Sequence, residues 1–128
     1  MTISPGAFLK LRRTAAGLSV ADLAAKLVTE PRMAEHLRAE WIELIEADIT
    51  PASFNTIVSL RHCYPFSLNI LEELSAIALG LNLAPPQICR ICGWNYDERD
   101  PADDCEEAPT EIVQGICSGC ARSLEGIA

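Results

Sequence analysis

Four cysteines in two pairs have the spacing of a tetrahedral metal site. The pairs are Cys89-Arg-Ile-Cys92 and Cys117-Ser-Gly-Cys120, and positions 93 to 116 separate them. Two residues between paired thiolates allow one tight turn to present both sulfurs to the same ion, and a second pair completes the shell. The sequence therefore predicts that one metal ion is bound by Cys89, Cys92, Cys117 and Cys120.

The segment between the two pairs is too polar to fold around a hydrophobic core of its own. Its carboxylates and prolines are Asp97, Glu98, Asp100, Pro101, Asp103, Asp104, Glu106, Glu107, Pro109 and Glu111. Such a composition buries too little apolar surface to offset the loss of conformational entropy. We therefore expect the metal ion to staple this part of the chain. The alternative is that the pairs form disulfides or remain free thiols.

A closed shell of four thiolates suits either zinc or iron. We expect zinc in a structural role, with iron as the alternative. A hydrolytic zinc is the least favoured reading, because four protein ligands leave no open position for water. Of the two remaining cysteines, Cys105 lies between the pairs and could approach the metal, whereas Cys63 stands among apolar residues and is expected to be a buried thiol.

The composition sets limits on the rest of the chain. Its 128 residues are 49% hydrophobic and only 5% aromatic, which favours a core of packed helices. The net charge is −8, yet residues 1–29 sum to +3 while residues 89–128 sum to −6. The protein as a whole should therefore repel nucleic acid, and its first helix is the one basic surface.

The compartment is expected to be the cytoplasm, with no membrane partner. The first residues lack the order of a secretory signal, and the longest apolar runs are too short to cross a bilayer. In a reducing compartment, clustered cysteines favour metal binding over a disulfide framework. We find no nucleophile motif, no phosphate-binding glycine loop and no carboxylate pair beside a histidine, so we expect no enzymatic activity.

Five short helices are expected before residue 84. Ser4 and Ser19 have the pattern of helix N-caps, the latter in a capping box with Asp22, and Gly17 suits a left-handed stop. The third helix is expected to open near Thr29, and its buried stripe to comprise Met33, Leu37, Trp41, Leu44 and Ile45. The last two helices are expected over residues 53–63 and 67–79. Pro85-Pro86 then separates a helical domain, 1–84, from a metal module, 87–128.

Three runs resemble the Xre/lambda-repressor type of helix-turn-helix family. Leu9-Lys-Leu-Arg-Arg-Thr-Ala-Ala-Gly-Leu-Ser-Val-Ala-Asp-Leu-Ala-Ala-Lys-Leu27 resembles its first two helices, with a Gly-Leu-Ser turn and a repeated Leu-Ala. Trp41-Ile-Glu-Leu-Ile-Glu-Ala-Asp-Ile-Thr-Pro51 is similar to the end of its recognition helix, and Leu74-Ser-Ala-Ile-Ala-Leu-Gly-Leu81 to its last helix. The resemblance covers most of residues 5–82. It implies a five-helix lambda-repressor-like bundle and a small transcriptional regulator of the kind that bacteria and phages encode.

The chain departs from that family where bases would be contacted. Residues 28–40 replace a turn of a few residues, so the recognition helix is expected to have grown at its N-terminal end. In the family that end enters the major groove. Here it would carry Glu40 and Glu43, and carboxylates facing phosphates weaken binding.

Four basic residues could contact phosphates weakly: Lys10, Arg12, Arg13 and Arg38. The alternative, which we favour for the first three, is a solvated helix face. If DNA readout has been lost, the same scaffold would bind a protein partner or a second copy of itself.

The first cysteine pair also resembles a different family. The run Cys89-Arg-Ile-Cys92-Gly-Trp-Asn-Tyr-Asp-Glu-Arg-Asp-Pro101 is similar to the first knuckle of rubredoxins. The second pair lacks the proline and the following glycine of that family. The resemblance implies an iron redox site as a further alternative, while the zinc reading implies a small metal-stapled ribbon after the helical bundle.

Overall fold

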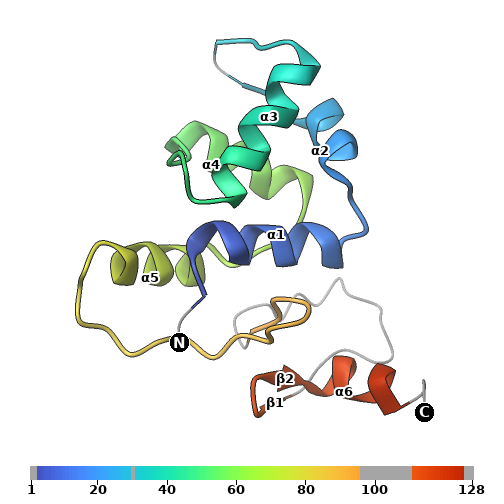
Figure 1. Cartoon of the computed structure of the whole chain (residues 1–128), viewed down its shortest axis with the longest axis vertical. Helices are drawn as coiled ribbons and strands as arrows, with labels where there is room; N and C mark the ends of the chain where they lie inside the picture. Colours follow the sequence, from blue (N-terminus) through green and yellow to red (C-terminus); the bar gives the residue numbers. More distant parts are fainter. Residues whose placement is uncertain (1–2, 30, 96–110, 126–128) are drawn as a thin grey trace. The chain divides into compact units, whose positions relative to one another are not determined.

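The computed structural model describes residues 3–29, 31–95 and 111–125. Within these ranges it contains six helices and one antiparallel two-stranded sheet, so the expected mainly helical class is confirmed (Figure 1). The chain divides into two compact units, Met1–Phe66 and Ser67–Ala128, here called the N-terminal and C-terminal units. The sequence placed a domain boundary at Pro85-Pro86, and that assignment stays a prediction.

Four helices form the N-terminal unit. They are α1 (Pro5–Ala15), α2 (Val20–Lys26), α3 (Glu35–Glu46) and α4 (Phe54–Cys63). Helix α3 packs against both α1 and α2. The core of this unit contains Phe8, Leu9, Leu23, Leu27, Ile42, Ile45, Leu60, Tyr64 and Phe66, all of which are buried.

The N-caps that the sequence indicates are confirmed. Ser4 Oγ accepts a hydrogen bond from Ala7 N at 3.1 Å, so α1 begins at the proline that follows this serine. Ser19 and Asp22 form a reciprocal capping box, and Gly17 ends α1 with a φ of 77°. Each signal lies within four residues of its partner, which explains why these helix ends are readable from the sequence.

Helix α3 differs from the prediction in its start and in its buried face. It begins at Glu35 without a side-chain cap, and Thr29 Oγ1 instead accepts from Met33 N at 3.1 Å in the preceding segment. Ile42 and Ile45 are buried as the packed face. The predicted stripe is wrong at two positions, since Leu37 and Leu44 are 42% and 37% exposed. These two lie seven residues apart on a helix and therefore share the outer face.

A buried ion pair and a hydrogen bond from a backbone amide join α1 to the end of α3. Arg13 is buried and forms a bidentate ion pair with Glu46, with N···O distances of 2.7 and 2.9 Å. Its third donor bonds to Leu18 O at 2.8 Å. Near the start of α1, Gly6 N donates to Asp48 Oδ1 at 2.9 Å. Arg13 was predicted either to contact phosphates or to lie on a solvated helix face. Both predictions are wrong for this residue, because it is buried and its guanidinium pairs with Glu46.

Gly6 allows α1 to approach the end of α3. A Cβ at this position would lie 2.5 Å from Ile45 O and 2.7 Å from Glu46 O, both backbone atoms that cannot move aside freely. We expect Gly6→Ala to destabilise the N-terminal unit by about 1–3 kcal/mol, since overpacking forces backbone shifts. Urea unfolding followed by circular dichroism measures this. Ala7→Gly, one residue along, is the control for the change in helix propensity, and an unchanged midpoint for Gly6→Ala would refute the close contact.

The C-terminal unit joins one helix to a small hairpin and a second helix. Helix α5 (Leu68–Ala78) is capped by Ser67, whose Oγ accepts from Ile70 N at 3.2 Å, and it stops before Gly80. Strands β1 (Ile112–Val113) and β2 (Ile116–Cys117) are antiparallel, and α6 (Ser118–Glu125) follows at once. Gln114 and Gly115 turn the hairpin with φ values of 54° and 77°. No helix in the described ranges has both the length and the apolar character needed to span a bilayer.

Candidate metal centre

The four predicted cysteines meet in one place. Their sulfur atoms all lie within 4.8 Å of one another, and the Sγ atoms of Cys92 and Cys117 are 3.6 Å apart. Cys89 and Cys117 are buried, while Cys92 and Cys120 are half-buried. The sequence prediction of which cysteines converge is thus confirmed. Cys105, which it left open, lies outside the described residues.

The first pair sits on a tight turn that its own backbone closes. Gly93 N donates to Cys89 O at 2.9 Å, and Cys89 N donates to Trp94 O at 2.8 Å. Gly93 has a φ of 79°, which is why a glycine follows the second cysteine of this pair. An antiparallel bridge between Ile88 and Asn95 brings the two ends of the turn together.

The second pair is built differently from the first. Cys117 ends strand β2 and Cys120 lies in the first turn of α6, so these ligands come from a strand-to-helix junction. The sequence predicted a second knuckle in a small metal-stapled ribbon; Cys120 instead lies in a helix, and the ribbon itself is not confirmed. Arg90 N donates to Gly115 O at 2.9 Å and so ties the first turn to the hairpin, while Ser118 N donates to Glu111 O at 2.9 Å and closes the hairpin at the start of α6.

Backbone amides point at the sulfur atoms. Ile91 N lies 3.4 Å from Cys89 Sγ, Trp94 N lies 3.4 Å from Cys92 Sγ, and Cys120 N lies 3.4 Å from Cys117 Sγ. An N–H donor favours the charged form of the atom that it faces. The turn and the helix start therefore stabilise thiolates before any cation is considered.

The cysteines do not titrate alike. Burial opposes ionisation of Cys89, but backbone N–H donors from Cys117, Cys92 and Ile91 outweigh it and lower the pKa of this thiol to about 6. Burial and then the neighbouring charge of Cys89 raise the pKa of Cys92 to about 12. Burial also raises the pKa of Cys120. One thiolate thus forms readily while its neighbours resist, which is the condition that a bound cation relieves.

The arrangement fits a tetrahedral ion. Sulfur atoms at about 2.3 Å from a zinc ion stand about 3.8 Å from one another in an ideal tetrahedron, and the 3.6 Å between Cys92 and Cys117 is close to this. Trp94 is buried beside the cluster, and Ile112 packs against it. Four thiolates complete the shell, so the ion would hold the fold together and would have no position for a substrate.

Two residues that shape the centre were missed by sequence reasoning. Asn95 is fully buried, and its amide nitrogen donates to Gly93 O at 3.3 Å. Trp94 covers the cluster with a side chain that is 6% exposed. Both follow the glycine after the first cysteine pair, and a polar residue next to a tryptophan at that place is the signal that could have indicated them.

The four basic residues proposed to contact phosphates are not equivalent. Lys10 is exposed, and Arg12 is half-buried with its Nε donating to Pro65 O at 3.4 Å. Arg13 is held by Glu46. Arg38 donates to Ala24 O and to Met33 O, each at 2.7 Å, and so holds the start of α3 to α2. Cys63 is half-buried rather than buried as predicted, and burial raises the pKa of its thiol.

Comparison of the chain with protein-family models, with curated proteins and with solved structures finds no match.

Proposed function

We propose that the chain is a small helix-turn-helix transcriptional regulator that contacts DNA weakly and whose C-terminal metal is structural zinc. The packing of α3 supports the regulator proposal. Helix α2 packs against it, and the buried ion pair of Arg13 with Glu46 fixes it to α1. A helix-turn-helix protein needs its third helix held in this way, with one face left outward to meet a groove.

The outward face of α3 argues for weak contact. Glu40 and Glu43 are exposed on it, between the exposed side chains of Leu37 and Leu44. Neither carboxylate can donate to a base edge, and both repel phosphates. Of the four basic candidates, Arg12, Arg13 and Arg38 all donate to acceptors within the unit, so sequence-independent attraction to phosphates is small.

A low-salt gel shift with nonspecific duplex tests this function. Removing two charges with Glu40→Gln and Glu43→Gln should strengthen binding, because the repulsion on α3 disappears. The plot of log affinity against log salt should be shallow, because each phosphate that a cation neutralises contributes a slope of only about −0.9. The matched control is Glu72→Gln with Glu73→Gln, an exposed pair on α5 with the same change in net charge.

The outcomes separate the candidates. Stronger binding by the α3 variant than by the α5 variant supports a DNA-facing α3. Equal strengthening by both would mean that only net charge matters. Tight, sequence-specific binding by the unmodified protein at physiological salt would contradict weak contact, and no detectable binding at low salt would reject the regulator.

A protein-interaction scaffold is the second candidate. The observation that favours it is the same outer face of α3, where Leu37 and Leu44 flank Glu40 and Glu43. Apolar and acidic side chains in one patch suit a protein surface better than a phosphate backbone. This candidate predicts no duplex binding in the assay above.

The iron alternative predicts a coloured protein with a reversible redox couple, whereas zinc predicts neither.

A further inference from the structure

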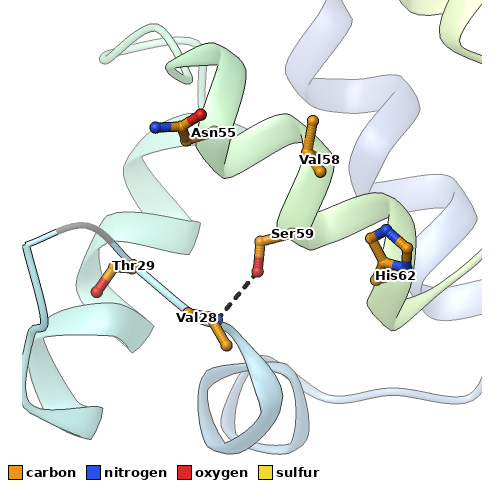
Figure 2. Close-up of a pocket in the computed structure, with 6 residues that line it drawn as sticks. All are labelled: Val28, Thr29, Asn55, Val58, Ser59 and His62. Carbon is orange, nitrogen blue, oxygen red and sulfur yellow. Dashed lines mark hydrogen bonds between the residues drawn. The ribbon is translucent and has the colours of Figure 1, made fainter.

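A groove lies on the N-terminal unit between α4 and the segment that follows α2. Its volume is about 490 Å³, which is in the range of sites that bind ligands. Figure 2 shows the two walls, which are formed by Val28 and Thr29 on one side and Asn55, Val58, Ser59 and His62 on the other.

The two walls are fixed to each other. Val28 N donates to Ser59 Oγ at 3.0 Å, a bond between residues 31 positions apart (Figure 2). Thr29 is buried and accepts from Met33 N, which holds the segment before α3 in place. Because backbone hydrogen bonds and burial hold this wall, the groove exists before any ligand arrives.

Apolar side chains line the groove and extend beyond it along α4. Val28 is 69% exposed and Val58 is 40% exposed. Phe54 lies one turn before Val58 on the same face of the helix and is 79% exposed. Adjacent exposed apolar side chains of this size mark surfaces that bind other molecules.

One end of the groove is cationic. Helix α4 contains no carboxylate in a chain whose net charge is −8, and it ends with Arg61 and His62, both exposed. Lys26, at the end of α2, is exposed and lies near enough for its charge to oppose the effect of burial on the Cys63 thiol. Lys26 precedes the lining residue Val28 by two positions, so an apolar groove with this cation near it complements an apolar ligand that carries negative charge.

We propose that this groove binds a short amphipathic segment of a partner protein, with apolar side chains against Val28 and Val58 and a carboxylate toward Lys26. The extended row of Phe54 and Val58 favours a peptide over a small molecule, since it continues past the groove for a further helical turn. The site uses neither Glu40 nor Glu43, so it goes beyond the proposed contact with DNA and does not depend on it.

Two synthetic amphipathic peptides test the site. Both place leucine at every third or fourth position, with glutamate between the leucines in one and lysine in the other. Fluorescence anisotropy with the full, metal-loaded chain should show the glutamate peptide binding at least about tenfold more tightly than the lysine peptide. Amide chemical shifts should change at Val28, Ser59 and His62 and not around the cysteine cluster.

Variants of the groove decide the outcome. Val28→Asp with Val58→Asp should reduce binding of the glutamate peptide by at least about tenfold, and both sites are exposed enough to keep the fold. Val113→Asp with Leu79→Asp, at side chains 59% and 84% exposed in the C-terminal unit, adds the same charge as the matched control and should change nothing. Lys26→Glu should remove or reverse the preference for the glutamate peptide.

Four results would overturn the proposal. They are equal affinity for both peptides, no measurable binding of either, full binding in the double valine variant, and self-association of the chain that Val58→Asp abolishes. The last result would assign the groove to a second copy of the chain instead of a peptide. Circular dichroism of each variant, compared with the unmodified protein, identifies any loss of binding that comes from unfolding.

Discussion

Replacing Cys92 with serine should release the metal and unfold the residues around the cysteine cluster while leaving the N-terminal unit folded. The described parts of this region, residues 88–95 and 111–125, contain two strands of two residues and few buried apolar side chains apart from the cysteines themselves. Metal binding of about 10–16 kcal/mol is the folding free energy of structural zinc sites in small peptides. With that contribution removed, the hairpin cannot hold together.

Two measurements on purified protein check this. Elemental analysis should find about one equivalent of metal in the unmodified chain and less than half an equivalent in the variant. Amide spectra should lose dispersion for Gly93, Trp94 and Ile116 and keep it for residues of α1 to α4. Cys63→Ser is the matched control, because this half-buried cysteine lies on α4 and outside the cluster. Loss of α1 to α4 in the Cys92 variant would mean that the two units fold as one.

The parts of the fold that were predictable depend on short stretches of sequence. Serine caps at Ser4, Ser19 and Ser67 act within three residues, so composition at the helix start is sufficient. The convergence of the four cysteines was predictable for a related reason. Two residues between paired cysteines fix the local turn, and four thiolates in two such pairs can all bind a single tetrahedral ion.

The parts that failed depend on tertiary contacts. Nothing near Arg13 in the sequence indicates that it is buried, because its partner Glu46 is 33 residues away. Arg38 also has a partner that is not adjacent in sequence, since it donates to Ala24 O, 14 residues away, as well as to Met33 O. The predicted buried stripe of α3 wrongly included Leu37 and Leu44. These leucines have the spacing of core residues, but no neighbouring helix covers them in the described structure.

The local geometry of the second cysteine pair was not predictable for another reason. A C-x-x-C motif is compatible with a turn and with the first turn of a helix, because both bring residues three apart together. Gly93 after the first pair indicates a turn through its positive φ. Ala121 after the second pair permits a helix, and Ser118 to Glu125 form one. The residue after each pair thus distinguishes the two geometries.

Substitution of Arg13 by methionine should strongly destabilise the N-terminal unit. The side chains of Arg13 and Glu46 are 7% and 8% exposed, so the variant leaves a carboxylate buried without its cation. Removing one partner of a buried pair costs about 3–5 kcal/mol. Because whole domains are stable by only about 5–15 kcal/mol, much of the unit's stability would be lost.

The charge itself, rather than the size of the side chain, should account for the loss, and a double change separates the two. Arg13→Met combined with Glu46→Leu removes both charges and should recover most of the stability, as replacement of buried pairs by apolar residues does. Arg13→Lys should recover little, since an ammonium cannot make the two parallel bonds to Glu46 and reach Leu18 O as well. Urea unfolding gives the midpoints, with exposed Lys10→Met as a control expected to change stability by less than about 0.5 kcal/mol. Equal destabilisation by the single and double variants would show instead that packing of the arginine stem, and not its pairing with Glu46, joins α1 to α3.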